Sequence, residues 1–215
     1  ASQIDQALAD ITVCDPAVGS GAFLVGMMNE IVKTRNVLSD FIKDNQRSPY
    51  EFKRHCIEHS LYGVDIDPGA VEIAKLRLWL SLVVDEENIR NIKPLPNLDY
   101  KIVCGNSLLG YTFTPRGLHK IEELKKLYFD ETNHTKKINI KDQIDSIIGK
   151  LFEETKKHIG YQIDFDFKIN FSEVFSRNGG FDVVIANPPY ISTKGRENID
   201  KKILAKVFNF VDDLY

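Results

Sequence analysis

The chain has 215 residues, of which 43% are hydrophobic and 27% are charged, a composition typical of a globular protein with one sizeable core. Its formal charge of −3 excludes the broad basic surface that holds a nucleic-acid backbone by charge alone. No apolar run approaches the length of a membrane span, and the N-terminus has no basic stretch followed by an apolar one, so we expect neither a membrane anchor nor a signal peptide.

The three cysteines, Cys14, Cys56 and Cys104, are widely spaced and include no Cys-x-x-Cys pair, and no histidine lies at metal-ligand spacing from them. Cys14 and Cys104 fall in predicted strands, where a reduced cysteine behaves as a small core residue. We therefore expect a reducing, cytoplasmic location and no bound metal.

A short predicted helix opens the chain, and residues 11–14 then form an apolar strand that leads into a turn containing glycine and a second helix. Such a unit carries a nucleotide-like ligand at the carboxyl edge of a parallel sheet, and Gly19 and Gly21 let the ligand approach the backbone. Leu24 replaces the third glycine of the dinucleotide-binding pattern, and the Asp15 carboxylate would repel a pyrophosphate. The turn therefore favours a ligand with a cationic amine or sulfonium over NAD; the alternative is a turn that serves tight packing only.

A second strand, residues 61–65, ends in an acidic tip and is followed by a helix with Pro68 in its first turn. An acid at this place holds the ribose diol in such folds, which makes Asp65 the candidate for that contact. Ile66 could lie flat against an adenine ring. Asp67, directly before the proline, is better explained as the N-cap of the helix.

A third strand is predicted over residues 100–104, and Asn106 follows it at the tip. Its side chain could donate to and accept from the edge of an adenine ring, or it could cap a turn. Residues 111–175 then form a long excursion that a compact α/β unit does not require. Its periodicity and mixed charge predict an inserted helical pair with solvated faces, and a nucleic-acid-binding arm is the less favoured interpretation. The domain boundaries follow: a ligand-binding half over residues 1–110, the insertion, and residues 176–215 as a return to the first domain.

The fourth predicted strand, residues 181–186, is a short β-branched run that we expect to be buried on both faces. It ends in Asn187, Pro188, Pro189 and Tyr190. Because a proline has no N–H group, this loop offers acceptors without donors. The Asn187 amide oxygen and the loop carbonyls could accept both N–H bonds of an amino group on a planar ring, with Tyr190 beside it. The alternative is a strand-ending turn with a capping asparagine and a packed tyrosine.

These motifs resemble those of the DNA methyltransferases that methylate exocyclic amines. More narrowly, they resemble the adenine-N6 branch found in type II restriction–modification systems, including enzymes that fuse a methylase and a nuclease in one chain. The resemblance rests on residues 15–24, 62–68, 105–109 and 187–190. It implies an α/β, Rossmann-like class I methyltransferase sheet of strand order 3-2-1-4, S-adenosylmethionine as cofactor and double-stranded DNA as substrate.

The resemblance also implies roles for individual residues. The cofactor would be bordered by Asp15, Ala17, Gly19 and Gly21 at its methionine end, by Asp65 at its ribose, and by Ile66 and Asn106 at its adenine. The catalytic residues would be Asn187, Pro188 and Tyr190. The first two would accept from the amine of an adenine flipped out of the duplex, and the tyrosine would stack on its ring. Direct transfer in this arrangement needs no nucleophilic residue and no metal.

Two departures from the complete family pattern accompany the resemblance. The motif that closes over the methionine end of the cofactor is not visible in residues 1–10, and the chain stops at Tyr215, about where a further strand is expected. We therefore expect a fragment of a larger enzyme, inactive on DNA alone, with a target-recognition domain and a fused or associated nuclease elsewhere. A protein-glutamine, RNA-base or cytosine-N4 methyltransferase and a non-catalytic Rossmann-like scaffold remain as alternatives.

Overall fold

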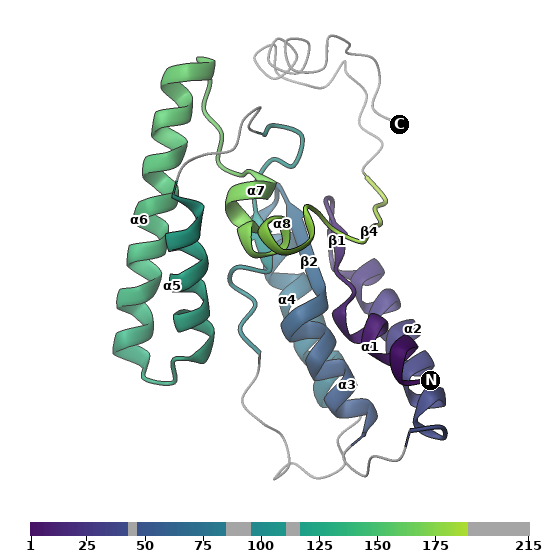
Figure 1. Ribbon diagram of the computed structural model, residues 1–215. Coiled ribbons are helices and arrows are strands. Elements are labelled where there is room, and N and C mark those ends of the chain that lie inside the picture. Colours follow the sequence, from purple (N-terminus) through teal and green to yellow (C-terminus); the bar gives the residue numbers. More distant parts are fainter. Residues whose placement is uncertain (43–46, 85–95, 111–116, 189–215) are drawn as a thin grey trace. The chain divides into compact units, whose positions relative to one another are not determined.

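The computed structural model describes residues 1–42, 47–84, 96–110 and 117–188 (Figure 1). The chain divides into two compact units, one of residues 1–105 with 180–187 and the other of residues 106–179 with 188–215. The first unit contains the β-sheet, and the second contains helices α5 to α8.

Parallel strands form a sheet in the first unit, and within the described residues their order is β3-β2-β1-β4. The strands are β1 (Val13–Asp15), β2 (Leu61–Asp65), β3 (Ile102–Cys104) and β4 (Val183–Val184). Val13 pairs with both Leu61 and Val183, and Gly63 pairs with Ile102. The predicted α/β class and the strand order 3-2-1-4 are confirmed. Because the strands are parallel, their carboxyl ends meet at one edge of the sheet.

The described residues of the first unit form five helices, of which α3 and α4 begin at a side-chain cap. They are α1 (Ser2–Asp10), α2 (Ala22–Ser39), α3 (Pro49–His55), the π-helix η1 (Cys56–Ser60) and α4 (Pro68–Val83). Ser48 caps α3 by accepting from the Glu51 N–H, with a proline at the first helical position. Asp67 accepts from the Gly69 N–H at 2.8 Å, which confirms it as the N-cap of α4.

One hydrophobic core lies between this sheet and its helices. Its buried members include Leu24, Met28 and Ile31 of α2, Ile57 of η1, Leu78 and Leu82 of α4, and Val13, Leu61 and Ile102 of the strands. Full burial of each such side chain contributes about 1.5–3 kcal/mol of transfer free energy. The core therefore ties the strands to the helices that pack against them.

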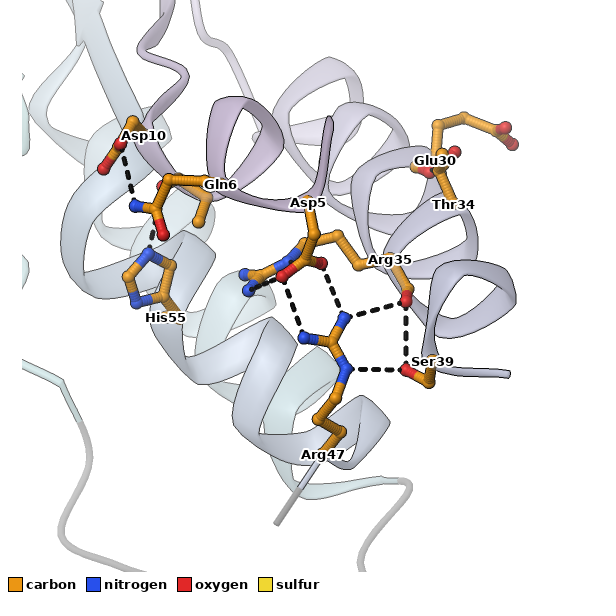
Figure 2. A network of polar contacts seen from close by, with 10 residues as sticks. Asp5, Gln6, Asp10, Glu30, Thr34, Arg35, Ser39, Arg47 and His55 are labelled. Atoms are coloured by element: carbon orange, nitrogen blue, oxygen red, sulfur yellow. Dashed lines mark hydrogen bonds and ion pairs between the residues drawn. The ribbon is translucent and has the colours of Figure 1, made fainter. Parts of the chain in front are cut away.

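Helix α1 is attached to this unit by a buried ionic cluster of Asp5, Arg35 and Arg47 (Figure 2). Asp5 Oδ1 accepts from Arg35 Nε at 3.0 Å and from Arg47 Nη2 at 2.6 Å, and Oδ2 accepts from Arg47 Nη1 at 2.8 Å. Both guanidinium groups lie over the Phe52 ring, 4.5 and 4.8 Å from its centroid. Hydrogen bonding to Arg47 is the main cause that holds the pKa of Asp5 well below its usual value of 3.8.

The second unit contains α5 (Leu118–Asp130), α6 (His134–Ile159), α7 (Phe167–Asn170) and α8 (Ser172–Asn178). Helices α5 and α6 pack against each other within the excursion between β3 and β4. The predicted solvated faces are interrupted at Lys125, which is buried and donates to the Asn170 carbonyl and, at 2.9 Å, to Glu173. No helix in the described ranges is both long and apolar enough to cross a membrane.

Two sequence expectations about burial are wrong. The strand at residues 181–186 is not buried on both faces: its side chains alternate in exposure and Val184 is 64% exposed. Among the described residues this strand pairs with β1 alone, so it lies at an edge. Cys104 is exposed because it ends β3 at the rim of the sheet, whereas Cys14 and Cys56 are buried. Burial raises the pKa of Cys14 to about 12 and that of Cys56 to about 11, so both thiols stay protonated.

Candidate functional site

The turn between β1 and α2, residues 16–21, is called the glycine turn below, and it folds against the tip of β2. Asp15 Oδ1 accepts from the Ala17 N–H at 3.0 Å, which closes the first part of the turn. The Val18 N–H donates to the Val64 carbonyl at 2.8 Å, and the Gly21 N–H donates back to the Val18 carbonyl at 2.8 Å. The turn is thus held by its own backbone and by the neighbouring strand.

Gly19 and Gly21 serve this turn in different ways. Both have positive φ, +49° and +79°, a conformation that L side chains rarely adopt. A Cβ on Gly21 would lie 3.2 Å from both Cα and Cβ of Ala74, so this glycine allows α4 to approach the turn. A Cβ on Gly19 would meet no described atom within 4 Å. Gly19 therefore presents its backbone to open space, where a ligand can approach it.

Asp65 ties the turn to the tip of β2. Its Oδ2 accepts from the Gly19 N–H at 2.8 Å, and its Oδ1 accepts from the Asp67 N–H at 3.0 Å. Both carboxylate oxygens are therefore engaged with backbone donors. Each carboxylate oxygen has a further lone pair, so the side chain can still accept a hydrogen bond from a ligand hydroxyl.

Asp15 is the most constrained acid of the site. It is 0% exposed, and its Oδ2 has no hydrogen-bond partner among the described residues. Burial raises the pKa of Asp15 above 3.8; the hydrogen bond from Ala17 opposes this shift, and the negative charge of Asp65 adds to it. A buried carboxylate oxygen without a donor is costly, and a cationic or N–H-bearing ligand group at this atom would remove that cost. The residues present therefore fit a ligand with an ammonium group.

Ile66 and Asn106 follow the next two strand tips. Ile66 is 69% exposed, and its carbonyl oxygen lies 3.6 Å from Cys104 Sγ. Asn106, which belongs to the second unit, uses its amide oxygen to accept from the Leu108 N–H at 3.0 Å. Turn capping, one of the two roles considered for Asn106, is thus observed. Its backbone N–H donates to Asp164 at 3.3 Å.

Asn187 leaves the sheet next to the glycine turn. Cys14 pairs with Val184, and the Ile185 N–H donates to the Cys14 carbonyl at 3.0 Å. Asn187 comes two residues later, at the same carboxyl edge as Asp15, and it is exposed together with Pro188. Tyr190 lies outside the described residues.

The sequence interpretation missed several residues that shape this edge. A Cβ at Gly63 would lie 2.8 Å from Val18 Cγ2, so Val18 can cover β2 only because residue 63 is glycine. A glycine inside a predicted strand is the signal that could have revealed this close approach. Arg77 of α4 donates to Ser20 Oγ at 2.9 Å, and no local pattern indicates that contact.

The described residues contain no group of three or more His, Cys, Asp or Glu side chains placed to hold a metal ion. The polar groups that converge on the carboxyl edge in the first unit are the Asp15 and Asp65 carboxylates, the backbone of the glycine turn and the Asn187 tip. The two carboxylates and the turn suit an organic ligand that carries an ammonium group and hydroxyls. The Asn187 tip, with its amide oxygen, could bind a second group beside that ligand.

Comparison with known proteins gives two curated relatives. The chain is 30% identical, over 264 residues, to the putative type II restriction enzyme and methyltransferase RM.MjaORFECS2P of Methanocaldococcus jannaschii, covering 85% of this chain and 22% of that protein. It is 26% identical, over 205 residues, to the type II restriction enzyme and methyltransferase RM.Eco57I of Escherichia coli, covering 88% of this chain and 15% of that protein. The chain thus spans about a fifth, or less, of the length of these relatives.

A family model also matches the chain. The model describes the Eco57I restriction-modification methylase, and the match extends over residues 59–215. It includes β2, β3, β4 and the Asn187 tip, and it covers more than half of the chain. Together with the parallel sheet and its glycine turn, this shows that the chain belongs to the Eco57I restriction-modification methylase family.

Proposed function

We propose that this chain is the catalytic part of a methyltransferase that uses S-adenosylmethionine to methylate the N6 amine of adenine in DNA. The observation that carries the proposal is the adjacency of two strand tips. β1 ends in the glycine turn, and β4, paired directly with β1, ends in Asn187 and Pro188. A ligand held by the first tip would therefore lie beside a group held by the second.

The residues of the first tip suit the methyl donor. Asp15 Oδ2, which has no partner among the described residues, would accept a hydrogen bond from the ammonium group. Asp65 would accept from the ribose hydroxyls, and the exposed Ile66 side chain would cover the adenine. Ala17, Gly19 and Gly21 would border the methionine part with backbone atoms, and Asn106 would face the adenine edge. The bound cofactor supplies an electrophilic methyl group on a sulfonium.

The residues of the second tip suit an aromatic amine. Asn187 offers an amide oxygen and Pro188 a carbonyl oxygen, both in exposed residues. Two acceptors that take the two N–H bonds of an amine favour a pyramidal nitrogen, whose lone pair then points away from the ring toward the methyl donor. The rate would come from orientation and fixed polarity. The adenine has to leave the duplex to reach this tip, and Tyr190 would stack on its ring.

The relatives suggest how this chemistry is used. Both are named type II restriction enzyme and methyltransferase, so we propose that the natural protein combines methylation with a nuclease in one restriction–modification enzyme. The chain carries a formal charge of −3, and we therefore assign most of the DNA contact to a target-recognition domain.

The test is Asn187→Ala in the natural full-length protein, with Asn178→Ala at the exposed end of α8 as the matched control. We expect Asn187→Ala to keep its affinity for S-adenosylmethionine and to lose methyl transfer, because only the amine loses an acceptor. The control should behave as wild type. Mass spectrometry of the nucleosides from methylated DNA identifies the product.

Each alternative has its own outcome in this experiment. Methylation that survives in Asn187→Ala would contradict the catalytic role of Asn187. N4-methylcytosine, or methyl groups found only on RNA or protein, would contradict the adenine assignment. Wild-type protein that binds no S-adenosylmethionine would support the non-catalytic scaffold.

A further inference from the structure

Thr12 and Asp182 form a reciprocal set of hydrogen bonds where β1 and β4 begin. Asp182 Oδ2 accepts from the Thr12 N–H and from the Thr12 hydroxyl, at 2.8 Å each. The Asp182 N–H in turn lies 3.1 Å from the Thr12 carbonyl oxygen and 3.2 Å from Thr12 Oγ1. Thr12 is buried, and the two residues are 170 positions apart in the chain. We name this pair the Thr12–Asp182 clamp.

The ladder that follows the clamp is short. The Val183 N–H donates to the Thr12 carbonyl and the Ile185 N–H donates to the Cys14 carbonyl, each at 3.0 Å. Val183 and Ile185 are partly buried against the core, whereas Val184 points away and is largely exposed. A strand with so little buried surface has a weakly specified register.

The two core-facing side chains, Val183 and Ile185, do not by themselves distinguish the observed register from one shifted by two residues, although the Phe181 ring also packs against Tyr62, with ring centroids 5.2 Å apart. Such a shift leaves every side chain on its own face, because side chains alternate with a period of two. The core would then receive Phe181 and Val183 in place of Val183 and Ile185, all of them apolar. On the opposite face, the successive residues are Gly180, Asp182, Val184 and Ala186. Among these, only Asp182 has a side-chain acceptor for the Thr12 donors, so the clamp favours the observed register on this face, as the Phe181–Tyr62 contact does elsewhere.

The register decides where Asn187 lies. A shift of two residues would move Asn187 along the strand by about 6.6 Å, at about 3.3 Å per residue. Misplacement of a reacting group by about 1 Å is enough to lower a rate about 100-fold. We propose that Thr12 and Asp182 are positioning residues that place Asn187 beside the glycine turn for methyl transfer. This inference rests on the proposed amine methylation.

The test compares Asp182→Ala with wild type in the natural full-length protein. We expect kcat for methyl transfer to fall about 100-fold, while the Kd for S-adenosylmethionine stays within about threefold, because the glycine turn is untouched. Titration with the cofactor counts the folded sites, so kcat is expressed per binding site. A merely structural role would lower the number of sites and leave kcat per site unchanged.

Further variants separate the clamp from general effects on β4. Thr12→Val removes the hydroxyl, which donates to Asp182 Oδ2 and accepts from the Asp182 N–H, but it keeps the backbone N–H donor of residue 12. This variant should therefore lower kcat less than Asp182→Ala, and Thr12→Ser, which keeps the hydroxyl, should have a kcat near that of wild type. The double variant Thr12→Val/Asp182→Ala should be no slower than Asp182→Ala, because both changes act on one contact. Val184→Thr, an exposed substitution of similar shape on the same strand, is the matched control and should keep wild-type kcat. Asp182→Asn keeps an oxygen that can accept from both Thr12 donors and should retain most of kcat, whereas Asp182→Leu, similar in size but without an acceptor, replaces Asp182→Ala if removal of the side chain prevents folding.

Two results would overturn the positioning role. One is wild-type kcat per binding site in the Asp182 variant. The other is an equal loss of cofactor affinity and kcat, which would show that Asp182 supports the whole edge and not Asn187 in particular. Failure of the proposed function has a different signature: Asn187→Ala would then methylate adenine at the wild-type rate, whatever the Asp182 variants do.

Discussion

At the scale of single residues, Asp15 connects the stability of the fold with the proposed ligand. Its carboxylate is fully buried with one oxygen lacking a partner among the described residues. The folded protein therefore holds a group whose charge is unfavourable until a cation arrives. Removing that charge should help the fold and harm binding.

We predict that Asp15→Asn raises the free energy of unfolding at neutral pH. The pKa of Asp15 is raised in the folded state, chiefly by burial, so the folded protein binds the proton more tightly than the unfolded chain does. Wild-type stability therefore falls as pH rises from 3.8 through the folded pKa, and stays lower above it. The advantage of the variant should be present at neutral pH and vanish toward pH 3.8.

Urea unfolding of both proteins over a series of pH values checks this prediction. Asp130→Asn, at the exposed end of α5, is the control and should stay within about 0.5 kcal/mol of wild type at neutral pH. The same Asp15→Asn variant should bind S-adenosylmethionine more weakly. A variant less stable than wild type at neutral pH would contradict the burial argument.

Asp65 and Asp67 form a matched pair for testing the cofactor site. Asp65→Ala removes two hydrogen bonds between a carboxylate and backbone N–H groups, each contributing about 1.5–3 kcal/mol. Because the Gly19 N–H then has no acceptor on β2, we expect cofactor affinity to fall by at least about 10-fold. Asp67→Ala removes only the cap of α4 and should cost about 0.5–2 kcal/mol of stability. Calorimetric titration with S-adenosylmethionine should find the cofactor affinity of Asp67→Ala unchanged. An equal loss of affinity in Asp65→Ala and Asp67→Ala would contradict a specific role of Asp65 in cofactor binding.

At the scale of elements, the ionic cluster of Asp5, Arg35 and Arg47 stabilises the packing of α1 against the rest of the first unit. We predict that Asp5→Asn destabilises the protein by about 3–5 kcal/mol, because two buried guanidinium groups lose their carboxylate. The pKa of Asp5 is lowered in the folded state, so its contribution is present above 3.8 and is lost as pH falls through the folded pKa. Denaturant unfolding measures the difference. Asp10→Asn, at the exposed end of the same helix, should stay within about 0.5 kcal/mol of wild type.

The packing of α4 against the glycine turn gives a second prediction at this scale. Gly21→Ala should be more destabilising than Gly19→Ala. Both substitutions force an L side chain into the left-handed region at about 1–2 kcal/mol, but only the Cβ at residue 21 also meets Ala74. The added overpacking should cost about 1–3 kcal/mol more. Thermal unfolding of the two variants, measured side by side, tests the order, and the reverse order would contradict it.

At the scale of the whole molecule, the charge of the chain sets an expectation for DNA. With a formal charge of −3, a polypeptide of residues 1–215 should bind a duplex weakly. The slope of log K against log salt should be shallower than about −3, since each neutralised phosphate contributes about −0.9. Fluorescence anisotropy with a labelled duplex at several salt concentrations measures this slope. Tight binding with a steep slope would reveal a basic surface that the net charge conceals.

The features that sequence predicts correctly are those that local signals determine. The apolar runs predicted the strands, the repeated change from strand to helix predicted the parallel sheet, and Asp67 before Pro68 predicted the start of α4. The bounds were less accurate: the expected strands at residues 11–14, 100–104 and 181–186 are observed at Val13–Asp15, Ile102–Cys104 and Val183–Val184.

The features that sequence did not predict depend on partners far along the chain. Asp5 and Arg47 are 42 residues apart, and Thr12 and Asp182 are 170 apart, so no local pattern pairs them. The exposure of Val184 depends on which strands pair with β4 within the described residues, and that of Cys104 on where β3 ends. At the proposed site, the residue types were readable from the sequence, whereas the engagement of both Asp65 oxygens by backbone donors required the fold.

The Thr12–Asp182 clamp also makes the proposed reaction insensitive to what is inserted before it. Closing a loop costs free energy that grows only with the logarithm of its length, about 0.6 kcal/mol for each doubling. The stretch between β3 and β4 can therefore gain or lose whole helices while the clamp still returns β4 to the same place beside β1. A sheet built in this way allows the segment inserted between β3 and β4 to change while the proposed chemistry is kept.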